Sequence, residues 1–110
     1  MKNLLFICSE NKLRSLTAET YFSNFKAISV IGAGTNKDAN TTISGDLIEW
    51  ADIVFVMEKS HRNKVNKKFK ELFKLKRMIV LDIPDNYDYM DRDLINLLDR
   101  SVSKHIILKK

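Results

Sequence analysis

The chain has 110 residues, of which 45% are hydrophobic and 30% are charged, and its formal net charge is +5. This length and composition are typical of a single globular domain with its own core, and they exclude an intrinsically disordered chain. No apolar run approaches the roughly 20 residues that a membrane-spanning helix needs, so we expect no membrane partner. The excess of positive charge favours anionic substrates.

The chain begins Met-Lys-Asn and passes directly into a short apolar run that ends at Cys8. This run is too short for a secretory signal peptide and lacks a small-residue cleavage site, so we expect a cytoplasmic protein. Cys8 is the single cysteine, which rules out an internal disulfide and a thiolate-rich metal site. Cys8 therefore either packs in the core or takes part in chemistry.

Four apolar runs rich in Val, Ile, Leu and Phe predict strands buried on both faces, because none of them alternates polar and apolar residues. Between these runs, apolar residues recur with the spacing of helices that pack one face on a core. In chain order the predicted elements are a strand at residues 3–7, a helix at 15–25, a strand at 28–31, a helix at 43–51, a strand at 52–57, a helix at 59–75, a strand at 78–83 and a helix at 91–105.

The alternation of strands and helices predicts an α/β fold with one parallel sheet and helices on both of its faces. We expect a single domain that comprises residues 1–110, because no linker or repeat divides the chain. In such sheets a ligand binds beyond the carboxyl ends of the strands. Those ends carry Cys8, Glu58 and Asp85, so the functional site is expected at this edge.

Residues 8–15, with the sequence Cys-Ser-Glu-Asn-Lys-Leu-Arg-Ser, join the first predicted strand to the first predicted helix and are called the Cys8 loop below. The start of a helix has unpaired N–H groups and a positive dipole end, which bind phosphate and favour a thiolate on Cys8. Arg14 can grip two phosphate oxygens in a bidentate fork. Ser15 can donate its hydroxyl to the sulfur, and Asn11 suits a left-handed backbone position.

A phosphate ester attacked by Cys8 needs a proton donor for its leaving oxygen, and water later needs a base. Asp85 is the better candidate because it follows the last strand at the edge where Cys8 lies, whereas Asp82 falls within the predicted strand. We therefore predict Cys8, Arg14 and Asp85 as catalytic residues. The predicted phosphate-binding and substrate-binding residues are Ser9, Glu10, Asn11, Lys12, Leu13, Arg14, Ser15 and Tyr87.

The order of these motifs resembles that of the low-molecular-weight protein tyrosine phosphatases. Cys8, Arg14 and Ser15 have the spacing of the family signature, directly after the first strand, with Asn11 at the expected position. Further similar segments, in the order of the family, are Thr-Ala-Glu at 17–19, Gly-Ala-Gly-Thr at 32–35, Ala-Asp-Ile-Val-Phe-Val-Met at 51–57, and Ile-Pro-Asp at 83–85 followed by Tyr87.

The resemblance implies a four-stranded parallel sheet in the order 2-1-3-4 and a phosphomonoester hydrolase that works through a phosphocysteine. It implies that Cys8 is the nucleophile, Arg14 the phosphate ligand, Ser15 the partner of the thiolate and Asp85 the general acid. It also implies that no cofactor is needed and that the substrate is a phosphorylated protein, with phosphotyrosine first.

Three features depart from the pattern of the family. Glu10 stands where the family has glycine, Asn86 follows Asp85 where the family has proline, and the segment after the second strand is shortened to a polar loop that ends near Thr42. These departures leave open an alternative, a phosphate-binding or phosphoprotein-binding module with weak or no catalysis. Arsenate reduction on the same scaffold relays oxidation through further cysteines, which this chain lacks.

The basic segment that begins at Lys59 and ends at Arg77 is interpreted first as a solvated helix face. The alternative is a nucleic-acid contact that brings a terminal phosphate of RNA or DNA to the Cys8 loop. His61 and His105 lack the partner spacing of a metal site or a cysteine-histidine pair, so we expect both on the surface and no metal. Trp50 ends an apolar helix and is expected in the core.

Overall fold

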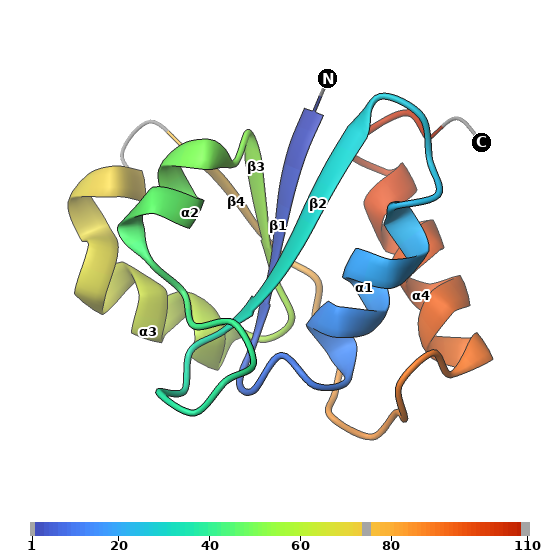
Figure 1. Ribbon diagram of the computed structural model, residues 1–110, viewed down its shortest axis with the longest axis horizontal. Coiled ribbons are helices and arrows are strands. Elements are labelled where there is room, and N and C mark those ends of the chain that lie inside the picture. The colour runs from blue at the N-terminus through green and yellow to red at the C-terminus, as the bar shows by residue number, and fades with distance from the viewer. Residues whose placement is uncertain (1, 74–75, 109–110) are drawn as a thin grey trace.

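The computed structural model describes residues 2–73 and 76–108, with the backbone alone for Phe73. In chain order it contains β1 (Lys2–Cys8), α1 (Arg14–Phe22), β2 (Ile28–Gly34), α2 (Gly45–Trp50), β3 (Ile53–Val56), α3 (Lys59–Phe69), the 3-10 helix η1 (Lys70–Phe73), β4 (Arg77–Val80) and α4 (Arg92–Ser103) (Figure 1). The predicted alternation of strands and helices is confirmed. Within the described ranges, no helix has the length and apolar character needed to cross a bilayer.

The strands form one parallel sheet in the order β2-β1-β3-β4, as predicted. The register pairs Cys8 with Gly34 across β1 and β2, and it pairs Val56 of β3 with Ile7 on one side and Val80 on the other. The carboxyl ends of the strands therefore meet at one edge of the sheet, where the Cys8 loop begins.

The helices α1 and α4 cover one face of the sheet, and α2 and α3 cover the other (Figure 1). Between the first face and its helices lies a buried hydrophobic cluster that includes Leu4, Phe6, Ala18, Phe22, Ile53, Phe55, Leu94, Leu98 and Val102. The second cluster includes Leu5, Ile7, Ile48, Val54, Val56 and Val65, with Trp50 half-buried against it. Successive residues of β1 point to opposite faces, and both faces are covered, which explains the unbroken apolar run in the sequence.

Aromatic stacking anchors the strand that carries Cys8. Phe6 lies between the rings of Phe22 and Phe55, with centroids 5.4 and 4.9 Å away. Such pairs contribute about 0.5–1.5 kcal/mol each beyond the burial of their surface. Because Phe6 precedes Cys8 by two residues on the same face of β1, the stack holds the root of the Cys8 loop in place.

All four predicted helices end earlier in the structure than expected, and α1 and α3 differ most. α1 ends at Phe22, because the side chain of Asn24 donates hydrogen bonds to carbonyls of the last turn. α3 ends at Phe69 and passes into the tighter turn of η1. Residues 74 and 75 and the side chain of Phe73, which the prediction assigned to the same helix, lie outside the described part of the chain.

β4 ends at Val80, whereas the predicted strand continued to residue 83. Asp82 has a φ of 55°, which strand geometry does not allow, so Asp82 lies after the strand and not within it. Ile83 still donates its N–H to the Met57 carbonyl at 2.8 Å. This contact keeps the segment beside β3 and brings Asp85 to the carboxyl edge of the sheet.

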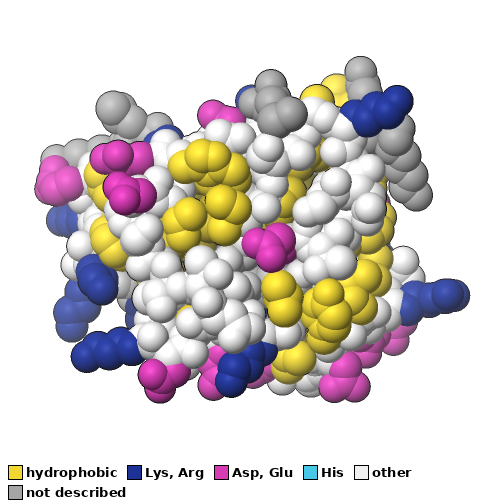
Figure 2. Space-filling view, in the orientation of Figure 1, with side chains coloured by type: hydrophobic (Ala, Val, Ile, Leu, Met, Phe, Trp, Pro, Cys, Tyr) yellow, Lys and Arg dark blue, Asp and Glu magenta, His cyan; other side chains and the backbone are white. Residues whose placement is uncertain are grey.

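The described part of the basic segment forms an exposed face of α3 and η1. Lys and Arg side chains project from the left end of the molecule in Figure 2, where α3 lies in Figure 1. Among the described residues of this segment, the exposed lysines are Lys59, Lys64, Lys67, Lys68 and Lys70. The interpretation as a solvated helix face is confirmed. Binding of nucleic acid by this face stays a prediction.

Candidate active site

A cavity of about 350 Å³ opens at the carboxyl edge of the sheet, where β1 passes into α1. It is lined by Cys8, Ser9, Glu10, Lys12, Leu13, Arg14, Asn36 and Asp85. The three predicted catalytic residues therefore share one cavity, although Asp85 is far in the chain from the loop that carries Cys8 and Arg14. Within residues 2–73 and 76–108, no cluster of three or more His, Cys, Asp or Glu side chains could hold a metal ion.

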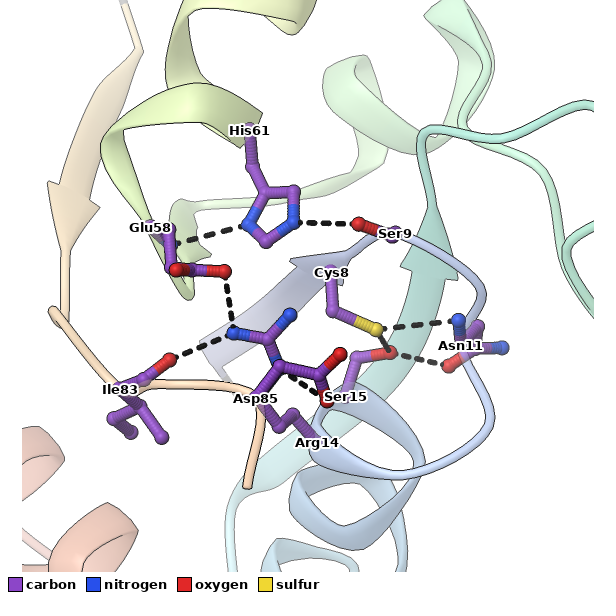
Figure 3. Close-up of polar contacts among 9 residues, drawn as sticks. All are labelled: Cys8, Ser9, Asn11, Arg14, Ser15, Glu58, His61, Ile83 and Asp85. Carbon is purple, nitrogen blue, oxygen red and sulfur yellow. Dashed lines mark hydrogen bonds and ion pairs between the residues drawn. The ribbon is translucent and has the colours of Figure 1, made fainter. Parts of the chain in front are cut away.

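The Cys8 sulfur lies inside the loop, and the residue is only 3% exposed. Asn11 donates its N–H to the sulfur at 3.2 Å, and the Ser15 Oγ lies 3.0 Å from it (Figure 3). Asn11 has a φ of 55°, so the predicted left-handed backbone is confirmed. The Ser15 hydroxyl donates to Asn11 Oδ1 at 2.6 Å. Since this hydroxyl has one proton, it donates to a thiolate only after leaving Asn11.

The polar loop after β2 braces the Cys8 loop. Asn36 donates its backbone N–H to the Ser9 carbonyl at 2.9 Å, and Asn40 donates its backbone N–H to the Glu10 carbonyl at 3.1 Å. The Asn40 side chain also donates to the Asn11 carbonyl at 3.0 Å. Three carbonyl oxygens that would repel an anion are thus engaged by the neighbouring loop. Sequence reasoning assigned no role to this loop.

Arg14 begins α1, and its side chain is 3% exposed. Its Nη1 donates to Glu58 Oε2 at 2.8 Å and to the Ile83 carbonyl at 2.7 Å, while its Nε lies 3.8 Å from Asp85 Oδ1 (Figure 3). The hydrogen bond from Arg14 lowers the pKa of Glu58, so this carboxylate is charged at neutral pH. Two acceptors therefore fix the plane of the guanidinium, and its Nε side faces the cavity.

His61 is 1% exposed, so the prediction that it lies on the surface is wrong. Its Nε2 lies 3.0 Å from Ser9 Oγ, and its Nδ1 accepts the backbone N–H of Glu58 at 3.1 Å (Figure 3). Burial, together with the charge of Arg14, lowers the pKa of His61 to about 4. His105 is partly exposed beside Phe55, which agrees with its predicted surface position.

Sequence reasoning placed Glu58 at this edge of the sheet but assigned it no role, and it missed His61 at this site. Glu58 lies two residues after the end of β3, and its position at the carboxyl edge was the available signal. His61 precedes Val65 by four residues and Phe69 by eight, which places it on the apolar stripe of α3. Helical periodicity alone therefore indicates that His61 is buried, and a search for metal or cysteine partners does not reveal it.

No family model matches the sequence. No curated protein matches it either. Among solved structures, the YwlE arginine phosphatase from Geobacillus stearothermophilus is similar with a TM-score of 0.76 and 20% identity over 94% of this chain and 92% of that one.

Two further solved structures are similar to this chain over almost its whole length. The tyrosine phosphatase Wzb from Escherichia coli K30, in complex with phosphate, gives a TM-score of 0.75 with 19% identity over 94% of both chains. The low-molecular-weight protein tyrosine phosphatase SP-PTP from Streptococcus pyogenes gives 0.78 with 12% identity over 96% of this chain and 94% of that one. The chain has the low-molecular-weight phosphatase fold. The expected fold is thereby confirmed over almost the entire chain.

On this phosphatase fold the rim of the cavity carries charge of both signs. The Glu10 side chain is more than half exposed, and its carboxylate lies 3.7 Å from the Lys12 ammonium. The Asp85 side chain is 64% exposed and also lines the cavity. Tyr87 packs against the core cluster beneath α1 and α4 and does not line the cavity. The described lining contains no aromatic ring, and Leu13 is its exposed apolar member.

Proposed function

We propose that the protein is a cysteine-dependent phosphatase that hydrolyses phosphomonoesters through a phosphocysteine on Cys8. One observation carries the proposal: the Cys8 sulfur, the Arg14 guanidinium and the Asp85 carboxyl line the same cavity. These are a nucleophile, an anion ligand and a proton donor, which together suffice for transfer of a phosphoryl group to sulfur. The similarity to solved phosphatases supports the proposal through the fold.

In the first step the Cys8 thiolate attacks phosphorus, and the bond from phosphorus to the ester oxygen breaks. Asp85 gives its proton to that oxygen, so the alcohol leaves neutral. The guanidinium of Arg14, held by Glu58 and Ile83, stabilises the charge that spreads over the equatorial phosphoryl oxygens. The loop N–H groups at the start of α1 act on the same oxygens.

In the second step a water molecule attacks the phosphocysteine while the Asp85 carboxylate accepts its proton. The bond between sulfur and phosphorus breaks, inorganic phosphate forms and the thiolate returns. Ser15 lies 3.0 Å from the sulfur, so its hydroxyl can donate to the departing thiolate once it turns from Asn11. Both steps balance without a cofactor.

We propose a phosphorylated protein as the substrate, with phosphotyrosine first. Leu13 supports this choice, because it is an exposed apolar side chain on the cavity wall against which an aromatic ring can lie. A phosphorylated arginine is the second candidate, in which the bond from phosphorus to a guanidino nitrogen would break in place of the ester bond. The carboxylates of Glu10 and Asp85 at the cavity favour it, because they can bind a guanidinium leaving group.

The test is turnover of a generic aryl phosphate by the wild type, Cys8→Ser, Asp85→Asn and Asp88→Asn. Cys8→Ser should abolish turnover, and Asp85→Asn should slow it about 10²- to 10⁴-fold while phosphate still binds. Asp88→Asn is the matched control, because Asp88 is an exposed carboxylate of the same segment that does not line the cavity. Undiminished turnover in Cys8→Ser would refute the mechanism.

Two further outcomes decide between the alternatives. Tight binding of a phosphorylated ligand without release of phosphate by the wild type would identify a binding module instead of an enzyme. A substrate panel of phosphotyrosine peptides, phosphoarginine peptides and phosphorylated ends of RNA and DNA then ranks the substrate classes by kcat/KM. A preference for phosphoarginine that is lost in Glu10→Gln would favour the second candidate.

A further inference from the structure

We propose that His61 is a positioning residue that fixes the direction of the Ser9 hydroxyl, so that its proton points to a phosphoryl oxygen in the cavity. The proposal rests on the proposed function, because it concerns the same phosphate site. His61 is nearly inaccessible, and Ser9 is part of the cavity wall. The histidine therefore acts on the ligand through the serine and does not touch the ligand itself.

The hydrogen bonds of the imidazole determine which of its nitrogens carries the proton. Glu58 donates its backbone N–H to His61 Nδ1 at 3.1 Å, so Nδ1 offers a lone pair and holds no proton. A neutral imidazole that accepts at Nδ1 carries its proton on Nε2. The contact of 3.0 Å between Nε2 and Ser9 Oγ is therefore a donation from His61 to Ser9.

Because the Ser9 oxygen accepts from His61, its own proton must point elsewhere. Ser9 adjoins Cys8 at the start of the loop and lines the cavity together with Cys8 and Arg14. An anion bound between these residues can accept the Ser9 proton in a charge-assisted hydrogen bond. A free serine hydroxyl has three staggered orientations, whereas the donor from His61 selects those that leave the proton toward the cavity.

Burial keeps this orientation constant over the neutral pH range. The interior position of His61 and the nearby charge of Arg14 lower its pKa to about 4, so the imidazole is neutral where a phosphatase of this type would work. The backbone N–H of His61 in turn donates to the Glu58 side chain, which holds Arg14. The first turn of α3 thus holds both ends of the Cys8 loop, Ser9 through His61 and Arg14 through Glu58.

The experiment compares His61→Asn with His61→Gln. The asparagine Oδ1 can replace Nδ1 as acceptor for Glu58 but cannot reach Ser9, whereas the glutamine amide can reach Ser9 as a donor. His61→Asn should weaken the affinity for inorganic phosphate and lower kcat/KM for an aryl phosphate about 10- to 100-fold, as expected for loss of one hydrogen bond to a charged group. His61→Gln should retain more of both.

A double-mutant cycle with Ser9→Ala separates positioning from a merely structural role. In the Ser9→Ala background, His61→Asn should change phosphate affinity by less than about twofold, because the hydroxyl that it orients is already gone. An undiminished effect of His61→Asn in that background would overturn the proposal. Circular dichroism and thermal melting check that each variant is folded.

The outcomes distinguish this proposal from the proposed function. If the wild type binds phosphate but does not hydrolyse esters, the proposed function fails, and the same cycle measured on phosphate affinity still decides the role of His61. If neither His61 variant folds, Ser9→Ala decides alone. Unchanged phosphate affinity in Ser9→Ala would then overturn the proposal, and a 10- to 100-fold loss would support it.

Discussion

Replacement of Gly32 by alanine tests how closely the Cys8 loop packs on β2. A Cβ atom at this position would lie 2.6 Å from Asn11 Oδ1 and 2.7 Å from the Ser15 carbonyl oxygen. Both distances are below the 3.0 Å that real Cβ contacts respect. The Asn11 amide can rotate away, but the Ser15 carbonyl belongs to the backbone of α1. The helix or the loop must therefore shift.

The expected cost has two parts. Overpacking of this kind destabilises a protein by about 1–3 kcal/mol. Displacement of Asn11 also removes the acceptor of the Ser15 hydroxyl, and a buried hydrogen bond of this type is worth about 1 kcal/mol. Alanine offsets about 0.4–1 kcal/mol of this cost, because it lowers the conformational entropy of the unfolded chain relative to glycine. We expect the free energy of unfolding of Gly32→Ala to fall by about 2 kcal/mol.

The assay is urea unfolding of Gly32→Ala beside Gly45→Ala, which undergoes the same change in the unfolded chain. At Gly45, the first residue of α2, a Cβ meets Leu72 Cδ1 at 3.3 Å, and this flexible side chain can yield. Gly45→Ala should therefore be as stable as the wild type or slightly more so, because alanine favours a helix. Equal stability of the two variants would refute the close packing of the loop on β2.

Three further predictions concern charge. The pKa of His61 is about 4 in the folded protein and 6.5 in the unfolded chain, so the unfolded chain binds the proton first as the pH falls. The free energy of unfolding should therefore be highest above pH 6.5 and should fall toward pH 4 by at most about 3 kcal/mol. His61→Gln should flatten this slope in urea unfolding at each pH, and an unchanged slope would contradict the assignment. Glu10→Gln should increase the affinity for inorganic phosphate about two- to fivefold at low salt and by less at high salt, because a negative charge near the anion is removed. If calorimetry finds the same affinity in this variant and the wild type, Glu10 does not act on the anion. Glu58→Gln should lower the free energy of unfolding by about 1–2 kcal/mol, because the buried Arg14 loses the nearer of its two carboxylate partners. Saturating phosphate should stabilise this variant more than the wild type, and equal stabilisation in thermal melts would count against the role of Glu58.

Local patterns were enough to predict the sheet and the Cys8 loop. Each apolar run corresponds to a strand of the sheet, because strands buried on both faces consist of consecutive apolar residues. Asn11 was assigned a left-handed backbone from its residue type, and its φ of 55° agrees. The strands and the backbone of the Cys8 loop depend on residues that are adjacent in the sequence, so both could be predicted from short segments.

The partners of the Cys8 loop could not be predicted in the same way. Whether Glu58 reaches Arg14 depends on the register that pairs Ile7 with Val56, because this register sets how far β3 extends beyond β1. Nothing in either strand specifies that register without the packing of both faces. The end of β4 was missed for a related reason, since the apolar run continues to residue 83 while the backbone turns at Asp82.

The contacts that hold the site join residues that are remote in the sequence. Arg14 is separated by 44 residues from Glu58 and by 69 from Ile83, and Ser9 is separated by 52 from His61. Contacts of such separation form late, because the entropy of closing long loops opposes them until the intervening elements have docked. In refolding, the phosphate site should therefore appear only after β4 has joined the sheet, later than the helical signal. Recovery of phosphate binding would thus report complete folding, and a chain with a native-like helix content could still lack a competent site.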